Sequence, residues 1–181
     1  MKMKPFVAAL AVVVSLMSLI SCEKEGVKLF DGNYSFKTSG ILTVERTAKV
    51  SESDASTEIL DFPDGNRTFR LALTSESGQM NVIKTGDNSV IVTMNVVGGD
   101  AFVFSGKAEG KVLTLDPAVR FVSFRDGANT VSLEITVSGT AEKHDDVAIF
   151  TLEYTGGGET TLYDYKILAS EVKCVAKLNE D

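Results

Sequence analysis

Strict alternation of apolar and polar residues is the feature that most restricts the fold of this chain. From Val131 to Ala141, small or apolar residues occupy every odd position and polar residues fill the positions between them. Successive side chains of a β-strand point to opposite faces, so this pattern gives one core-facing side and one solvent-facing side. A helix would scatter the same residues around its axis, and the alternation therefore predicts a strand.

The same period of two recurs along the chain after Asn33. It begins with Tyr34, Phe36, Leu42 and Val44, which share one parity. Further strands are predicted over residues 68–74, 80–84, 89–97, 101–108, 111–115, 119–124, 147–154 and 165–178. Because no stretch keeps a helical period for long, the sequence predicts an all-β domain.

Short glycine-containing turns separate most of these segments, for example at residues 86–88, 98–100, 109–110, 126–129 and 156–158. Tight turns of this composition join neighbouring strands in antiparallel order. We therefore expect an antiparallel meander of roughly 8–10 strands, closed as a barrel or folded as a two-layer sandwich. One polar connection, residues 47–66, is longer than most loops and is a candidate lid.

The amino terminus has the architecture of an export signal. Lys2 and Lys4 precede a run from Phe6 to Ile20 that is apolar apart from two serines, and a small residue follows. This run is shorter than the roughly 18–20 residues that a membrane-spanning helix needs. We therefore predict that residues 1–21 are a signal peptide.

The end of that segment, Leu19-Ile20-Ser21-Cys22, resembles the lipobox of bacterial lipoproteins. The resemblance implies that Cys22 is lipidated, that residues 22–30 form a tether, and that residues 31–181 form a single domain. It also implies an outer-membrane location, on the periplasmic face or the cell surface, with the membrane as a partner through the lipid. The alternative is an ordinary cleaved signal in which Cys22 is incidental.

The net charge limits the classes of molecule that the chain could bind, and the cysteine count limits its disulfides. The chain has 18 basic and 25 acidic residues, a net charge of −7, and this sign disfavours nucleic acid as a partner. With Cys22 lipidated, Cys174 has no partner for a disulfide and is expected to be a small buried hydrophobe.

Catalytic and metal-binding signals are weak. His144 is the only histidine and lies in a charged turn, which suits a solvated side chain better than a catalytic base. Glu134 and Glu153 would suit a glycosidase only if their strands faced the other way. The aspartate-rich turns lack the spacing of a calcium-binding loop, and no phosphate-binding glycine loop is present. We therefore expect a protein that is not an enzyme and that has no metal or cofactor.

From residue 31 to 178 the pattern is similar to the lipocalin-like, or calycin-like, small lipoproteins of Gram-negative bacteria. The likeness lies in the anchored start, the opening Gly32-Asn33-Tyr34 and the hairpin meander, with Tyr34 where calycins have tryptophan. It implies a barrel around a small apolar ligand, without catalysis. Lys173 or Lys177 of the last strand would then pack over the Tyr34 ring.

Two functions follow from this reading. The first is a binding barrel that holds one small hydrophobic ligand, with residues 47–66 as its lid. The second is a packed domain that acts as a surface interaction module or an accessory subunit of an envelope complex. For the first, the candidate ligand-binding residues are the inward apolar side chains Val92, Met94, Phe102, Phe104, Leu133, Ile135, Phe150 and Leu152.

Overall fold

A computed structural model describes residues 26–49 and 66–180. The predicted signal peptide, Cys22 and nearly all of the long loop at 47–66 lie outside the described residues. The described strands are β1 (Gly32–Ala48), β2 (Arg67–Ala72), β3 (Glu76–Lys84), β4 (Ser89–Val96), β5 (Ala101–Glu109), β6 (Val112–Asp126), β7 (Asn129–His144), β8 (Val147–Glu159) and β9 (Tyr163–Leu178). A helical turn, residues 26–30, precedes them.

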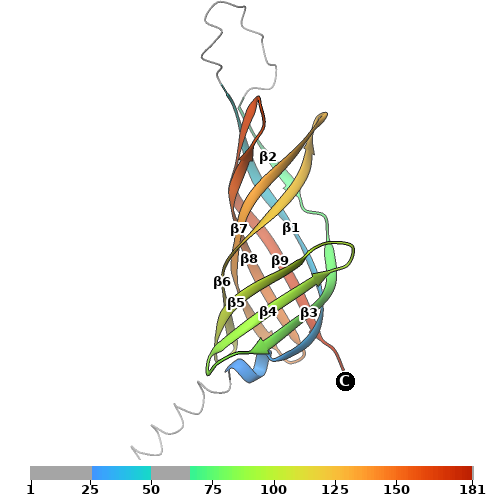
Figure 1. Ribbon diagram of the computed structural model, residues 1–181, viewed down its shortest axis with the longest axis vertical. Coiled ribbons are helices and arrows are strands. Elements are labelled where there is room, and N and C mark those ends of the chain that lie inside the picture. The colour runs from blue at the N-terminus through green and yellow to red at the C-terminus, as the bar shows by residue number, and fades with distance from the viewer. Residues whose placement is uncertain (1–25, 50–65, 181) are drawn as a thin grey trace, which may run out of the picture.

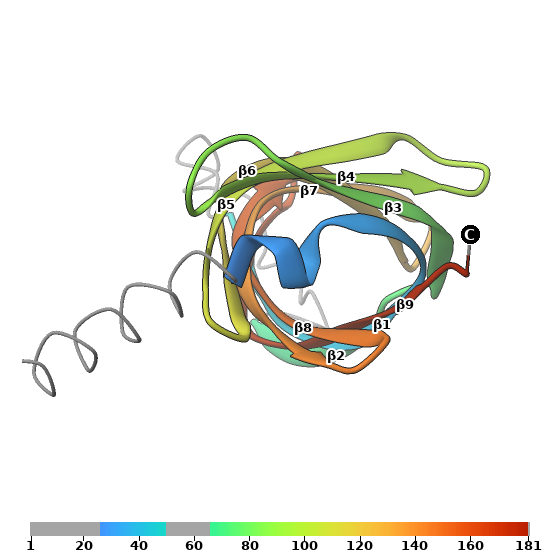
Figure 2. The same ribbon diagram turned by 90° about the horizontal axis from the view of Figure 1, so that it is seen from below.

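The strands form one antiparallel sheet that closes into a barrel. Its order is β2-β1-β3-β4-β5-β6-β7-β8-β9, and β9 pairs with β1 to complete the ring. Figure 2 shows this ring from below, with the helical turn lying across its lower end. The all-β meander is therefore confirmed, and closure of the sheet excludes the two-layer sandwich.

Strand β1 has different neighbours along its length. Its first part, Gly32–Thr38, pairs with β3, and its second part, from Ile41 to Arg46, pairs with the short strand β2. Along the other edge, β1 pairs with β9 from Tyr34 to Ala48. The upper half of the barrel in Figure 1 is therefore bounded by β2, and the lower half continues into β3, β4 and β5.

Strand β6 also changes neighbours, at a bulge next to Pro117. It pairs with β5 only from Val112 to Leu115, whereas it pairs with β7 along most of its length. The sequence predicted two strands here, and this was wrong because the chain continues through the bulge. Proline has no N–H to donate to a ladder, so the strand can lose its neighbour on one side without ending.

These two changes leave a seam in the upper barrel, which we define as the boundary between residues 67–76, from β2 to the first residue of β3, and residues 118–126 of β6. Among the described strands, β2 pairs only with β1, and this part of β6 pairs only with β7. Backbone hydrogen bonds therefore do not join the two edges. Side chains connect them instead, including the rings of Phe69 and Phe124, whose centroids are 5.9 Å apart.

The lower end of the barrel is closed by residues 26–30. Val27 and Phe30 are fully buried, and the Tyr34 hydroxyl donates a hydrogen bond to the Phe30 carbonyl at 2.8 Å. The sequence predicts these five residues as part of the tether, but Val27 and Phe30 pack into the core while Lys28 and Leu29 stay exposed, so the folded domain begins no later than Gly26. Only the polar residues 23–25 indicate a solvated tether, and they give no information about the apolar residues that follow them.

A lysine packs over the Tyr34 ring, although on a different strand from the one predicted. Lys143 of β7 lies with Nζ 4.5 Å from the ring centroid and donates to the tyrosine hydroxyl at 3.0 Å. Lys173 and Lys177 are exposed on the outer face. Burial lowers the pKa of Lys143, and Asp146 partly opposes this shift.

The three glycines at 156–158 lie inside β8 rather than in the turn that the sequence predicted. The register between β8 and β9 shifts between Leu152 and Gly157. A Cβ atom at Gly156 would lie 2.4 Å from the Glu134 carbonyl oxygen, and one at Gly157 would lie within van der Waals exclusion of Tyr165. The run of glycines therefore lets β8 approach both neighbouring strands where the barrel coils sharply.

Candidate functional site

A buried ionic cluster holds the top of the seam together. The Asp126 carboxylate, at the tip of the β6–β7 hairpin, accepts hydrogen bonds from Arg46 at 3.0 Å, from the Tyr165 hydroxyl at 2.9 Å and from Arg67. These three partners come from β1, β9 and β2. The side chains of Asp126 and Arg46 are about 5–6% exposed and shielded from water, whereas that of Arg67 is 43% exposed and forms the solvent side of the cluster.

The electrostatics of this cluster favour the ionised aspartate. Burial by itself would raise the pKa of Asp126, but hydrogen bonds from Tyr165 and Arg46, together with the charges of Arg46 and Arg67, outweigh it and hold that pKa below its ordinary value. Burial and the bond to Asp126 raise the pKa of Tyr165 to about 12. Every group in the cluster is thus committed to a neighbour, and we interpret it as structural.

Below the ionic cluster the seam encloses a cavity of about 260 Å³. The residues that line it come from both edges of the seam, from the connection between β2 and β3, and from the inner faces of β1 and β8. They are Thr38, Leu71, Ala72, Leu73, Thr74, Glu76, Arg120, Phe121, Val122, Ser123, Phe124 and Tyr154. Exposed Ala72, Thr74 and Phe121 mark its rim, and we name this space the seam cavity.

An ion pair spans the seam at this cavity. Arg120 of β6 donates from its two terminal nitrogens to the two carboxylate oxygens of Glu76 in β3, at 3.2 and 2.6 Å. The Phe102 ring covers the guanidinium, with 3.8 Å between Cζ and the ring centroid. The Arg120 and Glu76 side chains are only 13% and 27% exposed, and paired geometry of this kind strengthens the interaction.

Polar side chains of the seam cavity bond to one another or to neighbouring residues. Thr38 is 4% exposed and forms a side-chain hydrogen bond with the Cys174 thiol, and Arg120 forms one with Tyr154 in addition to those with Glu76. Tyr154, also buried, lies on the same lining, and burial raises its pKa while Arg120 partly opposes this. The cavity therefore has a mixed lining, in which apolar side chains stand beside the polar groups of Thr38, Glu76, Arg120 and Tyr154.

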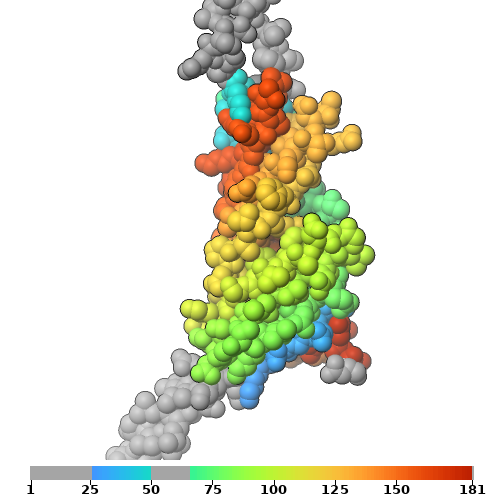
Figure 3. Space-filling model, in the orientation of Figure 1, coloured from blue at the N-terminus to red at the C-terminus, as the bar shows by residue number. Residues whose placement is uncertain are grey.

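A second, smaller cavity of about 110 Å³ lies where β5 separates from β6. Phe102, Phe104 and Val137 contribute to its lining, and Arg120 lies between it and the seam cavity. Figure 3 shows this side of the molecule, where β3, β4 and β5 cover the lower half and the β6–β7 hairpin rises above them. Both cavities thus follow the line along which β6 loses its second neighbour.

The candidate ligand-binding residues all belong to the inner side of the barrel. Phe102 is partly buried, and the other seven, Val92, Met94, Phe104, Leu133, Ile135, Phe150 and Leu152, are buried in one core. Only Phe102 and Phe104 line either of the two cavities described above. The predicted residues are therefore brought together, but chiefly as packing around one another.

Sequence reasoning missed the polar groups of the seam cavity. Arg120 has the same parity as Val122 and Phe124, and this parity faces inward. An arginine on the inward face of a strand needs a buried partner. The inward parity of Arg120 is therefore the sequence signal that could have predicted a buried polar site. Nothing local in the sequence identifies Glu76, 44 residues away, as that partner.

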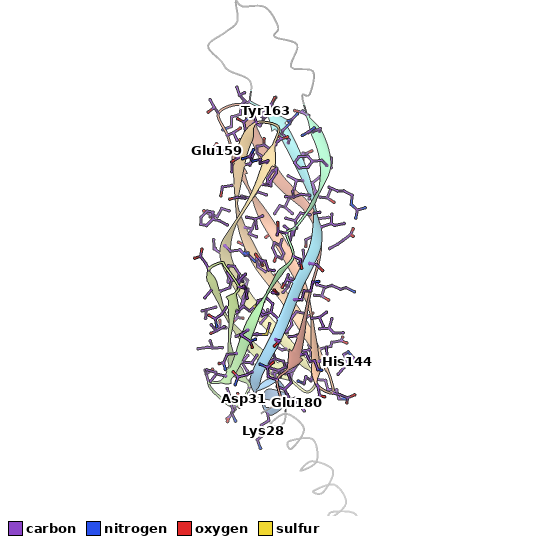
Figure 4. The ribbon with its side chains drawn as sticks, turned by 90° about the vertical axis from the view of Figure 1, so that its right-hand side faces the viewer. Lys28, Asp31, His144, Glu159, Tyr163 and Glu180 are labelled. Carbon is purple, nitrogen blue, oxygen red and sulfur yellow. The ribbon has the colours of Figure 1, made fainter. Side chains whose placement is uncertain are left out.

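The residues weighed for catalysis lie on the surface. Glu134 and Glu153 are exposed, and His144 is exposed at the lower end, where Figure 4 shows it far from Tyr163 at the upper end. His144 lies 3.5 Å from Glu142, which is also exposed. Cys174 is buried as predicted, and burial raises the pKa of its thiol to about 11.

Within residues 26–49 and 66–180, no cluster of three or more His, Cys, Asp or Glu side chains has the geometry to hold a metal ion. The same part of the chain contains no helix long and apolar enough to cross a membrane.

Comparisons with known proteins do not assign this chain to a family. No family model matches the sequence, and no curated protein matches it. Among solved structures, a redesigned β-barrel aligns over 86% of this chain and 96% of its own, with 13% identity and a TM-score of 0.34. We draw no functional argument from a likeness of this strength.

Proposed function

We propose that this protein is a lipid-anchored lipoprotein of the outer membrane, of lipocalin-like type, that binds one small hydrophobic molecule and catalyses no reaction. The observation that carries the binding role is the seam cavity, which is lined by leucine, valine and phenylalanine side chains together with polar residues. The anchor is supported by the lipobox at Cys22 and by an export signal before it.

The proposed binding site lies at the side of the barrel, whereas the sequence predicts it in the middle. The predicted core residues pack against one another, whereas the seam cavity opens at residues that are exposed. An edge without a backbone ladder is easier to part than a paired one, since no interstrand hydrogen bonds have to break. The seam is therefore the natural entrance for a ligand.

Native mass spectrometry of the full chain, released gently from membranes, tests this function. We expect a bound hydrophobic molecule on the wild-type chain and on Val119→Trp, which alters the outer face of β6. We expect its loss from Val122→Trp, in which the indole would fill the seam cavity. Circular dichroism of both variants checks that the barrel is intact, and a wild-type chain without any bound mass would contradict the proposal.

A second function, as a surface interaction module of an envelope complex, is favoured by one observation. Val119 and Phe121, on the outer face of β6 beside the free edge, are 63% and 64% exposed. A photo-cross-linking residue at position 119 in intact cells should then capture one envelope protein repeatedly. The same cross-linker at exposed Val175 on β9 serves as the control, and equal or absent capture at both positions argues against this role.

A further inference from the structure

We propose that the seam is a docking site for an extended segment of a partner protein, which adds as a strand to the free edge of β6 and carries acidic side chains on its outward face. This inference rests on the second proposed function, the interaction module, and gives it a site and a class of partner. It comes from the backbone edges, the apolar inner side and the arginines of the seam.

The backbone of the seam defines the conformation of the partner. Among the described strands, residues 118–125 of β6 and residues 67–72 of β2 are each paired on one side only. Alternate N–H and C=O groups of both edges therefore point into the seam. An extended chain presents donors and acceptors at the same spacing, and addition of a strand to a free edge is a recurring mode of peptide recognition.

The side chains that bridge the seam lie on its inner side. Arg120 and Glu76 both occupy inward positions of their strands, so their ion pair crosses inside the wall of the barrel. The Phe69–Phe124 contact is also on this side, because both rings pack against the core. These side chains form the floor of a groove, and the two backbone edges are its walls.

The floor of this groove is apolar and only partly covered. On β7, which has a neighbour on both sides, the inward apolar residues between 131 and 137 are fully buried. The inward apolar residues of the seam are only partly buried, and they are Phe69, Leu71, Leu73, Ala118, Val122 and Phe124. A strand with apolar side chains facing inward would cover them and the mouth of the seam cavity.

The arginines of the chain are concentrated at the seam. Of five arginines, four lie within residues 67–76 and 118–126, and the fifth, Arg46, bonds to Asp126. These two ranges contain no lysine and two acidic residues, Glu76 and Asp126, so the seam carries a net charge of +2 in a chain of −7. Arginine pairs with carboxylates in a bidentate way and is enriched in protein interfaces. The local charge therefore favours an acidic partner and disfavours a second copy of the same edge.

Two exposed arginines give the acidic side chains their position. Arg70 on β2 and Arg125 on β6 occupy outward positions on opposite edges of the seam. Arg70 lies 3.3 Å from Glu171, but both side chains are more than half exposed, so water weakens this pair. Outward side chains of a strand recur at every second residue, so a partner with carboxylates at alternate positions would present them to both guanidinium groups.

A peptide of about seven residues with alternating valine and glutamate, blocked at both ends, is a probe of this chemistry. We would measure its binding to the full chain in phosphatidylcholine nanodiscs by fluorescence anisotropy, with empty nanodiscs as the blank. One matched peptide has lysine in place of glutamate, and another has N-methyl groups on its central residues, which remove backbone donors. We expect the glutamate peptide to bind at least about tenfold more tightly than either control.

Hydrogen exchange locates the bound peptide. When the glutamate peptide is bound, the amides of residues 118–125 that face the seam should exchange more slowly than in the free chain. The amides of β7 are already paired on both sides over much of its length and should not change. Unchanged exchange along β6 in the presence of saturating peptide would overturn the proposed site.

Substitutions of the two exposed arginines test the charge of the partner. Arg70→Gln and Arg125→Gln should each weaken binding of the glutamate peptide about two- to fivefold, as expected for one exposed ion pair. Lys107→Gln is the matched control, since Lys107 is exposed on β5, which does not border the seam, and it should bind as the wild type does. Circular dichroism of each variant checks that the barrel is intact.

The outcomes separate this inference from the function on which it rests. Equal binding of the glutamate and lysine peptides would overturn the acidic strand, while repeated capture of one protein by the cross-linker at position 119 would keep the interaction module. Failure of both the peptide and the cross-linker would overturn both. A dimer in sedimentation experiments, with the same amides of β6 protected, would identify a second copy as the occupant and overturn the proposal. Selective binding of the glutamate peptide, with protection of β6 and loss in both arginine variants, supports it.

Discussion

At the scale of single residues, buried charge is what distinguishes this barrel from a simple alternating sheet. Asp126 and Arg46 are almost fully shielded from water, and Lys143 is 8% exposed. Burial of a charge is unfavourable unless a partner and hydrogen bonds compensate for it. Each of these side chains has such contacts with another strand or its aromatic ring, so the charges connect strands that the backbone ladder leaves apart.

The Asp126 cluster gives the first prediction. Asp126→Asn should lower the free energy of unfolding by about 3–5 kcal/mol, because it leaves the Arg46 guanidinium buried without a counter-charge. Urea unfolding at neutral pH measures this loss. Asp164→Asn, at a side chain 59% exposed near the same end, is the matched control and should change stability by less than about 0.5 kcal/mol. Similar losses in both variants would mean that the cluster has no special role.

Tyr34 gives a prediction about alkaline pH. Burial, with a smaller contribution from Asp31, raises its pKa to about 12, against 10.0 for an unperturbed tyrosine. The folded chain therefore holds this proton after the unfolded chain has lost it, so stability declines as pH rises from 10 to 12, by about 2–3 kcal/mol for two pH units. The lowered pKa of Lys143 has the opposite effect, but only below its ordinary value of 10.5.

Urea unfolding at pH 10.5, 11, 11.5 and 12 measures that decline, and Tyr34→Phe isolates the tyrosine. The variant loses the hydrogen bond to Phe30 at every pH, but its stability should fall less steeply than that of the wild type. Parallel declines in the two proteins would show that Tyr34 does not titrate as expected.

At the scale of elements, alternation predicted the strands well but not which edges they share. Every predicted strand lies in or overlaps an observed one, because parity is a local property of the sequence. The joining of two predicted strands through Pro117 and the placement of the three glycines inside β8 depend on contacts with neighbouring strands. Those contacts form between residues distant in sequence, so local patterns did not contain them.

The same distinction explains what was predicted of the site. An inward apolar surface follows from parity alone, and seven of the eight candidate ligand-binding residues are buried there. The seam cavity requires that β6 leave β5 at Pro117 and meet β2 through side chains only. Arg120 and Glu76 become neighbours because of that arrangement, which no single segment of sequence encodes.

The helical turn at 26–30 gives a prediction at this scale. Phe30→Ala should lower the free energy of unfolding by about 3–5 kcal/mol, because Phe30 is fully buried at the lower end of the barrel. Leu29→Ala is the matched control, since Leu29 is 41% exposed and its truncation should cost less than about 0.5 kcal/mol. Chemical denaturation of both proteins decides whether this turn belongs to the domain or to a tether.

At the scale of the whole molecule, the barrel is closed by two different means. The lower half is joined mainly by backbone ladders, with a short β5–β6 pairing, whereas the upper half is joined across the seam by the Asp126 cluster, the Arg120–Glu76 pair and the Phe69–Phe124 contact. No interstrand backbone hydrogen bonds have to break for the two edges of the seam to separate. We therefore expect local opening of the barrel to begin at the seam.

Hydrogen exchange in the native state tests this expectation. Between Ala118 and Arg125, backbone amides that bond to β7 should be protected, and the alternate amides that face the seam should exchange much faster. Strand β7, paired on both sides over much of its length, provides the internal control, with protection at successive amides. Even protection along β6 would show that its second edge is covered.

The buried turn at 26–30 limits how far the barrel can stand from the membrane, and this distance affects how a ligand would reach the seam cavity. With Cys22 lipidated as proposed, three residues lie between the anchor and Gly26, and the four residue steps from Cys22 to Gly26 span no more than about 14 Å. Thr38 lies six residues up β1 from Gly32, about 20 Å farther along the strand. A ligand leaving the bilayer would therefore cross water before it reached the seam cavity, which suits a small, sparingly soluble molecule better than a long-chain phospholipid.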